Sequence, residues 1–285
     1  MKLLRFGPAG EEKPGLQLDD ETRIDASGFG MDWNHDFFAD PANLDKLKSW
    51  IDANAGSAPP LDADVRLGSA VARPGKLICI GLNFSDHAAE AGMDIPAEPI
   101  VFMKATSAIV GPNDTVTIPR NSEKTDWEVE LAFIVGKKAS YVSKDEALDY
   151  VAGYVLHNDY SEREFQIERG GQWVKGKSCD TFAPLGPFVA TSDEIADPEN
   201  LGMWLKVNGE TKQNGNSNKL IFGIAHLVSY LSQFMTLEPG DVVSTGTPPG
   251  VGMGFKPPQY MKPGDVVELG IDGLGSSSQT AVACG

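Results

Sequence analysis

The sequence has few cysteines and no long hydrophobic run. Its three cysteines, Cys79, Cys179 and Cys284, are too few and too scattered for a disulfide framework or a zinc knuckle. A reducing cytoplasm is therefore the expected compartment. No apolar segment is long enough to span a bilayer, and the first residues lack the apolar stretch of a signal peptide.

Basic residues are also scarce relative to acidic ones. The chain has 24 lysines and arginines against 40 aspartates and glutamates, which gives a net charge of −16. Without a basic stripe, nucleic acids and anionic membranes are not expected as partners. A small anionic substrate remains compatible with this charge, because a bound cation and a few local basic side chains can reverse the field in one pocket.

Glycine and proline, in contrast, are abundant. The 285 residues include 31 glycines and 19 prolines, which favours a fold rich in strands and turns over a helical bundle. We predict a β-rich α+β fold, with a small N-terminal domain over residues 1–70 and a larger domain over residues 71–285. In the first, a strand is predicted at 2–6 and a helix at 41–53; the second opens with a buried strand at 76–81.

Local signals predict several further elements. Ser85 is expected to cap a short helix that Gly92 ends. The spacing of Ser143 with Glu146, and of Ser161 with Glu164, is typical of capping boxes that open two more helices. Asn208-Gly209 predicts a hairpin turn, and helical spacing of apolar residues predicts a helix within 222–235.

The segment 126–135 places two carboxylates at the start of an otherwise apolar strand. Glu128 and Glu130 are two residues apart, so they point to the same face of the strand. Two adjacent buried carboxylates repel each other, and a bound cation relieves that repulsion. All-oxygen ligands favour a hard ion such as Mg²⁺, Mn²⁺ or Ca²⁺. The alternative is an edge strand with two solvated glutamates.

Other polar residues fit either chemistry or ordinary structure. Asp159, which ends a predicted strand, is a third oxygen ligand or a turn residue. His87 and Glu90 lie three apart on a helix, so they form a general-base pair or a surface pair of no consequence. Arg163 and Gln166 share a helical face that contacts a carboxylate substrate or is solvated among neighbouring glutamates.

Two later segments could also carry chemistry. Lys177 lies in an irregular run, 173–181, and its ammonium group could stabilise a developing oxyanion. Cys179 in the same run has no histidine paired with it in sequence, so a nucleophilic role is disfavoured. The glycine-dense loop 244–254 precedes no helix that could hold a pyrophosphate. We expect its backbone N–H groups and Thr247 to bind a small carboxylate, unless it is a purely structural turn.

The order of these motifs resembles the fumarylacetoacetate hydrolase family. The resemblance runs from Pro74 to the C-terminus, and residues 1–70 resemble the short N-terminal domain of many members. The motifs that carry it are Gly81-Leu82-Asn83-Phe84-x-x-His87-x-x-Glu90, Glu128-x-Glu130, Asn158-Asp159, Gly176-Lys177-Ser178 and Thr245-Gly246-Thr247-Pro248. One departure is Phe84, where many relatives have tyrosine.

By this resemblance the fold is a mixed β-sandwich roll that forms a homodimer. The resemblance also implies a role for each site residue. The implied metal ligands for Mg²⁺, Mn²⁺ or Ca²⁺ are Glu128, Glu130 and Asp159; the implied catalytic residues are His87, Glu90 and Lys177; the implied substrate contacts are Arg163, Gln166 and Thr247.

The activity implied is metal-dependent hydrolysis of a carbon–carbon bond in a small 2,4-dioxo acid. The acid is an acylpyruvate or a 2,4-diketo-3-deoxy sugar acid. The sugar acid is included because segment 171–182 resembles members linked to sugar-acid breakdown. The same site suits decarboxylation of a 2-oxo diacid, tautomerisation or hydration, because each passes through a metal-stabilised enolate. Association with the family also allows ureidoglycolate cleavage. A non-catalytic binding protein on this scaffold is disfavoured, because neither the dyad nor a metal ligand is missing.

Overall fold

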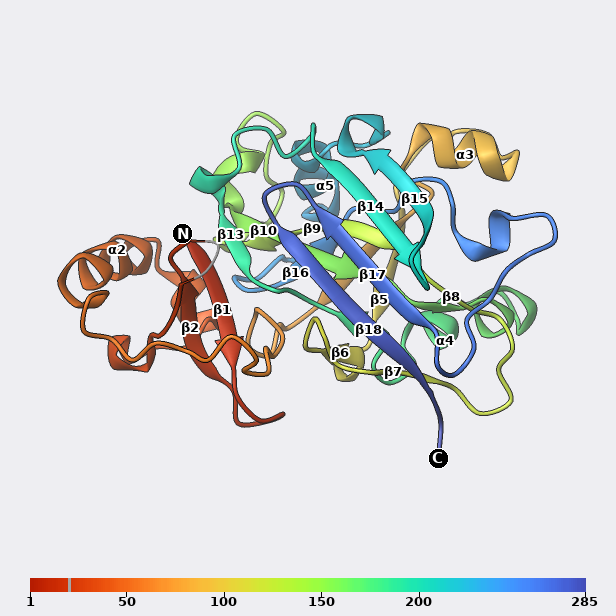
Figure 1. Cartoon of the computed structure of the whole chain (residues 1–285). Coiled ribbons are helices and arrows are strands. Elements are labelled where there is room, and N and C mark those ends of the chain that lie inside the picture. Colours follow the sequence, from red (N-terminus) through yellow and green to blue (C-terminus); the bar gives the residue numbers. More distant parts are fainter. Residues whose placement is uncertain (20–21) are drawn as a thin grey trace.

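The computed structural model describes residues 1–19 and 22–285, and two β-sheets form its centre (Figure 1). The larger is a nine-stranded sheet with the order β3 (Arg23–Asp25), β2 (Lys13–Gln17), β1 (Lys2–Phe6), β13 (Val189–Thr191), β10 (Val151–Asn158), β9 (Val129–Val135), β16 (Val242–Ser244), β4 (Leu77–Gly81) and β5 (Ile100–Lys104). The smaller is a five-stranded sheet with the order β15 (Glu210–Asn216), β14 (Gly202–Val207), β17 (Val266–Ile271), β18 (Gly275–Ala283) and β7 (Val116–Ile118).

The helices are short and lie around these sheets. They are α1 (His35–Ala39), α2 (Ala42–Asn54), α3 (Ser85–Ala91), α4 (Val174–Lys177) and α5 (Ile224–Leu231), with a π-helical segment at Glu164–Glu168. Two small strand pairs, β8 (Thr125–Asp126) with β11 (Ser161–Glu162) and β6 (Ile109–Val110) with β12 (Ala183–Pro184), complete the sheet structure. These elements confirm the β-rich α+β fold. None of the helices in the described residues is long and apolar enough to cross a membrane.

The core lies where the two sheets pack on each other. Every residue of β9 is buried, and β14 and β17 of the smaller sheet pack against it. Because both faces of β9 are covered, its sequence is an almost continuous apolar run rather than an alternating one. Its one charged residue, Glu130, therefore lies inside the protein rather than on a solvated edge.

The first 70 residues extend the large sheet and carry an aromatic cluster. Strand β1 pairs with β13, so β1, β2 and β3 continue the sheet outward, at the left of Figure 1. The predicted strand at 2–6 matches β1, and the predicted helix at 41–53 matches α2 to within one residue at each end. Trp33 and Phe37 are fully buried there, and the Trp33 indole N–H donates to the Leu4 carbonyl at 2.7 Å.

Some local predictions are confirmed. Gly92 ends α3 in the left-handed conformation, with φ at 64°. Asn208 and Gly209 form the turn of the β14–β15 hairpin, both with positive φ, as this two-residue turn requires. The predicted helix within 222–235 is α5, which is shorter at both ends.

The predicted helix caps are wrong in two places. Ser85 is the first helical residue of α3, and its hydroxyl donates to the Lys219 carbonyl instead of capping. Ser161 lies in strand β11, where its hydroxyl donates to the Asp159 carbonyl. Ser85 is bound by a residue distant in the chain, and Ser161 is held in a strand by pairing with Asp126 of β8, so tertiary structure outweighs the local capping signal in both cases. Ser143 does bond Glu146 at 2.7 Å, but only a short 3₁₀ turn (Ala147–Tyr150) follows.

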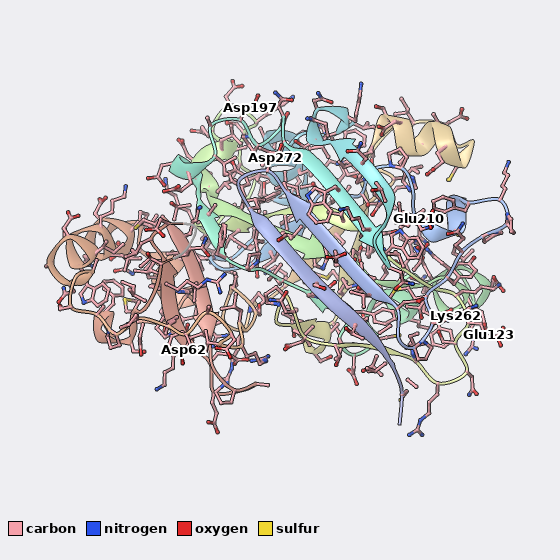
Figure 2. The ribbon with its side chains drawn as sticks, in the orientation of Figure 1. Asp62, Glu123, Asp197, Glu210, Lys262 and Asp272 are labelled. Carbon is pink, nitrogen blue, oxygen red and sulfur yellow. The ribbon has the colours of Figure 1, made fainter. Side chains whose placement is uncertain are left out.

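The surface carries the excess acidic charge. Figure 2 shows Asp62, Glu123, Asp197, Glu210 and Asp272 on the outside of the ribbon, and all five are exposed. Charged groups at such positions are solvated and need no partner. The acidic residues that need an explanation are instead the buried ones.

Strand direction explains where those buried residues gather. Strands β4 and β16 are parallel, and β9 is antiparallel to both β16 and β10. The carboxyl ends of β4, β16 and β10 therefore lie at the same edge of the sheet as the amino end of β9. Loops that follow three strands, and the residues that open β9, meet at this edge.

Candidate active site

Three buried carboxylates meet at this edge of the sheet. Glu128 immediately precedes β9, Glu130 lies in it, and Asp159 immediately follows β10. The Asp159 N–H donates to the Glu128 carbonyl at 2.9 Å, which fixes the two chain ends side by side. One carboxylate oxygen from each residue lies within 4.8 Å of the others. The three residues predicted as metal ligands thus form one cluster.

Two of the three carboxylates are neutralised by buried cations. Lys177 Nζ donates to Glu128 Oε2 at 2.7 Å and to Asp159 Oδ2 at 2.8 Å. Lys104 Nζ donates to Asp159 Oδ1 at 2.5 Å. Burial opposes ionisation of Asp159, but Lys104 and Lys177 together hold its pKa well below the ordinary value. Burial likewise opposes the charged form of Lys177, yet Asp159 and Glu128 raise its pKa above the ordinary value.

Glu130 is different, because its partners are neutral. Its Oε2 accepts from the Ser244 hydroxyl at 2.5 Å and from the Gly246 N–H at 3.1 Å. Within the described part of the chain, no lysine or arginine forms an ion pair with it. Burial, together with the nearby Asp159 and Glu128 carboxylates, raises the pKa of Glu130 well above its ordinary value. A divalent cation among three carboxylates would supply the missing charge, so the donor set fits a hard ion.

His87 and Glu90 form the predicted pair beside this cluster. The His87 Nδ1 lies 3.1 Å from Glu90 Oε2, and Glu90 Oε1 also accepts the Gly250 N–H at 3.1 Å. With Nδ1–H donating to the carboxylate, the lone pair of His87 Nε2 is free to accept a proton. His87, Glu128 and Glu130 line one cavity of about 330 Å³, so the structure brings the dyad and the acidic cluster together.

Arg163 and Gln166 also line this cavity, and both are buried. Their burial excludes the solvated-face alternative. Arg163 donates from Nη2 to Glu128 Oε1 at 2.7 Å and from Nε to Asp126 Oδ2 at 2.8 Å, and its Nη1 donates to Gln166 Oε1 at 3.0 Å. Its fork therefore holds protein groups in this structure, and direct contact of Arg163 or Gln166 with substrate stays a prediction.

Thr247 lines the cavity with its hydroxyl already bonded on both sides. Its Oγ1 donates to the Val129 carbonyl at 2.9 Å and accepts from Gln213 Nε2 at 2.8 Å. The hydroxyl proton is therefore directed at the protein backbone. The predicted contact of Thr247 with a substrate carboxylate would require exchange of that hydrogen bond.

The glycine-dense loop 244–254 holds protein carboxylates rather than leaving its N–H groups free. The N–H groups of Gly246, Gly250 and Gly252 donate to side chains of Glu130, Glu90 and Asp126, respectively. Only glycine fits at position 250, where φ is 100° and a Cβ would lie 1.9 Å from a backbone oxygen. The loop therefore positions one metal-ligand candidate and the dyad carboxylate.

Sequence reasoning missed four buried polar residues at the site. Lys104 binds Asp159, and Asp126 joins Arg163 to the glycine-dense loop. The Ser244 hydroxyl donates its proton to Glu130, and His157 Nδ1 lies 2.7 Å from the Ser244 hydroxyl oxygen. Because that hydroxyl proton is already used, His157 Nδ1–H is the donor to Ser244 Oγ. Burial outweighs the nearby Asp159 and lowers the pKa of His157 to about 3, so its ring is neutral. Lys104 and His157 could have been noticed in the sequence, because each is a charged or polar residue near the end of an apolar strand.

The buried Lys104–Asp159 pair yields a stability prediction. Lys104→Met is expected to lower the free energy of unfolding by roughly 3 kcal/mol, because Asp159 loses one of its two buried counter-charges. Urea unfolding measures this, with Lys138→Met as the control. Lys138 forms an exposed pair with Glu238 at 3.6 Å, so no measurable change is expected there. Equal effects of both changes would contradict a structural role for Lys104.

Comparison with known proteins agrees with this geometry. The chain is 54% identical over 281 residues, covering 98% of each chain, to a Burkholderia multivorans protein named no more specifically than as a hydrolase. Among solved structures, it resembles a maleylpyruvate hydrolase from Sphingobium sp. SYK-6 in complex with manganese(II) and pyruvate, with 29% identity, TM-score 0.81 and full coverage of both chains. It also resembles a probable 2-hydroxyhepta-2,4-diene-1,7-dioate isomerase from Mycobacterium abscessus, with 32% identity, TM-score 0.82 and full coverage of both chains.

A family profile decides the classification. The profile described as fumarylacetoacetate (FAA) hydrolase C-terminal matches residues 76–282, which include the acidic cluster, the dyad and Lys177. The predicted fold type is confirmed by the structural neighbours, which share it over their full length. The chain therefore belongs to the fumarylacetoacetate hydrolase family.

Proposed function

We propose that this protein is a divalent-cation-dependent hydrolase that cleaves the C3–C4 bond of a small 2,4-dioxo acid. The observation that carries the proposal is one cavity with two features. One is an acidic cluster whose Glu130 has no ion-pair partner among the described residues, and the other is a His87–Glu90 pair whose imidazole Nε2 can accept a proton. The first feature supports a cation site, and the second supports activation of water.

The reaction balances as a simple hydrolysis. A water molecule loses a proton to His87 Nε2 and its oxygen bonds to C4. The C3–C4 bond breaks, and its electron pair leaves as the enolate of the 2-oxo acid. His87 then returns the proton to C3, so the products are a carboxylic acid and pyruvate or a related 2-oxo acid. Glu90 keeps the ring oriented and stabilises its protonated form.

Cleavage of the C3–C4 bond is the step that needs positive charge nearby, because it leaves the electron pair on the enolate. When bound, a Mg²⁺ or Mn²⁺ ion held by Glu128, Glu130 and Asp159 supplies that charge. Lys177 lies against two of these carboxylates and lines the cavity, and these contacts support a role for its ammonium group in stabilising the same developing anion. The manganese and pyruvate in the named Sphingobium structure support this assignment by analogy.

Isomerisation is the second candidate, because one structural relative bears an isomerase name. Tautomerisation on this scaffold needs a proton carrier but no attacking water. The His87–Glu90 pair serves both reactions, whereas only hydrolysis consumes water and releases two products. Product analysis separates them.

The test is decay of the enol absorbance of acetylpyruvate with Mg²⁺, and then with excess chelator. We expect decay with Mg²⁺ that yields equimolar pyruvate and acetate, and loss of at least about 10³-fold in rate with chelator. Restoring activity with Mg²⁺ or Mn²⁺ controls for damage by the chelator. Decay without pyruvate, or decay that chelator leaves unchanged, would contradict the proposal.

A further inference from the structure

The cavity that holds the acidic cluster changes character along its length. Strand β5 shows this change, because Ile100, Phe102 and Lys104 lie on one of its faces at every second residue. Lys104 reaches Asp159, while the Phe102 ring lies 5.0 Å from Lys177 Nζ. Ile100 follows further from the cluster and, like Phe102, lines the cavity. This face of β5 thus turns from charged to apolar with distance from the carboxylates.

Trp173 extends the apolar wall. Its indole packs edge-on against Phe102, with ring centroids 5.3 Å apart. A Cβ at position 81 would lie 2.5 Å from Trp173 Cζ3, so Gly81 leaves the space that the indole fills. Leu82, Ile167 and Met253 line the same cavity. Aliphatic and aromatic side chains therefore surround the space beyond Phe102.

The charges of the site are already matched near the cluster. The described residues that line the cavity include one arginine, Arg163, and one lysine, Lys177. Arg163 binds Asp126 and Glu128, and Lys177 binds Glu128 and Asp159. A second carboxylate at the far end of a substrate would meet no unpaired lysine or arginine among these lining residues, and it would lie against the apolar side chains of Phe102 and Trp173. The hydroxyls of a sugar-acid chain would likewise lie against Ile100 and Phe102, whose side chains have no hydrogen-bonding group.

We propose that the natural substrate is a 2,4-dioxo monocarboxylate whose acyl end is an unsubstituted alkyl or aryl group packed against Phe102 and Trp173. This inference rests on the proposed function and narrows it. It separates this chain from the relatives named for maleylpyruvate and for a dioate, since the compounds in those names carry two carboxylates. It also selects the acylpyruvate over the sugar acid among the two substrate classes that the sequence left open.

The test uses binding, so that it is independent of cleavage. In the presence of Mg²⁺, affinities are measured by calorimetry for pyruvate, 2-oxohexanoate, 2-oxooctanoate and 2-oxoadipate, which lack the 4-oxo group and are not cleaved by this route. We expect affinity to rise about threefold per methylene from pyruvate to 2-oxooctanoate. We expect 2-oxoadipate to bind about tenfold more weakly than 2-oxohexanoate, which has the same chain length and one carboxylate. Equal or tighter binding of 2-oxoadipate would overturn the proposal.

Matched variants locate the effect. Trp173→Ala is expected to weaken 2-oxooctanoate about tenfold and to change pyruvate affinity less than twofold, because only the long chain reaches the indole. Trp204→Ala, which truncates another partly buried tryptophan outside this cavity, is expected to change neither affinity. Ile100→Ala truncates a second side chain of the same apolar wall, and its affinity for 2-oxooctanoate is measured in the same way. Unchanged 2-oxooctanoate affinity in both wall variants would overturn the placement of the acyl group.

The binding series and the acetylpyruvate assay can fail independently of each other. If acetylpyruvate is not hydrolysed but the binding series rises with chain length, hydrolysis is wrong while the apolar subsite stands. If acetylpyruvate is hydrolysed but the series is flat or favours 2-oxoadipate, the function stands and the substrate class is wrong.

Discussion

Glu130→Gln is expected to stabilise the metal-free protein and to abolish its activity. Glutamine has the shape of glutamate, and its amide oxygen can accept the hydrogen bonds that Ser244 and the Gly246 N–H now donate. The change removes a buried carboxylate that has no ion-pair partner among the described residues, so the free energy of unfolding should rise. At about 2–4 °C per kcal/mol, differential scanning calorimetry detects a gain of this kind.

Activity should change in the opposite direction. Without Glu130 the acidic cluster keeps two carboxylates, both already bound to Lys177. We expect the Mg²⁺-induced rise in Tm to disappear and kcat/KM to fall by about 10³-fold, because the cation contributes several kcal/mol of charge stabilisation. Glu123→Gln, at an exposed position, is the control and should leave Tm, Mg²⁺ response and turnover unchanged. A Glu130→Gln variant that kept its Mg²⁺ response would contradict this cation site.

The raised pKa of Glu130 also gives stability a defined pH dependence. In the metal-free protein the folded state holds a proton on Glu130 over a range where the unfolded chain has lost it, so the folded state binds more protons. The contribution of Glu130 to the free energy of unfolding therefore falls as pH rises from the unfolded value near 4.5 to the raised folded value. Asp159 acts separately, since its lowered pKa gives stability that is lost only as pH falls below about 3.8. In urea unfolding at a series of pH values, Glu130→Gln should remove the fall in the free energy of unfolding above about pH 4.5. The loss of stability below about pH 3.8, which comes from Asp159, should remain.

Sequence alone predicted the parts of the site that lie close together in the chain. Glu128 and Glu130 are ordered by the two-residue period of a strand, and His87 and Glu90 by one helical turn. Local sequence signals also predicted β1 and α2, and the Asn-Gly dipeptide predicted the turn at Asn208–Gly209. What the sequence could not provide is which residues distant in the chain neutralise these carboxylates, because that depends on strand order.

The missed residues show this dependence. Lys104 is 55 residues from Asp159 in the chain, and Ser244 is 114 residues from Glu130. They meet because β5 and β16 occupy particular places in a sheet whose order is not the chain order. The same reason explains the glycine-dense loop, whose N–H groups were predicted to bind a ligand but are used by Glu90, Asp126 and Glu130. A motif identified the loop, whereas only the fold identified its partners.

His87→Ala is expected to lower kcat by about 10²–10⁴-fold while leaving the Mg²⁺-induced rise in Tm intact. The reason is that His87 carries the free nitrogen of the cavity but forms no contact with the acidic cluster among the interactions of the described residues. Loss of turnover without loss of cation binding therefore separates the base from the metal ligands. His226→Ala, which removes a partly exposed histidine stacked on Phe222 and Tyr230, is the control and should keep full activity.

Imidazole distinguishes a chemical role from a structural one. His87 is partly accessible and lines the cavity, so added imidazole can enter the space that His87→Ala leaves and should restore part of kcat. Glu90→Gln should cost less, about 10-fold, because its amide oxygen still orients the ring but no longer stabilises the imidazolium, and imidazole should not restore it. If His87→Ala stopped water-dependent cleavage yet still tautomerised the enol substrate, the dyad would serve hydrolysis alone. Full hydrolytic activity in His87→Ala would instead require the attacking water to be activated without this base.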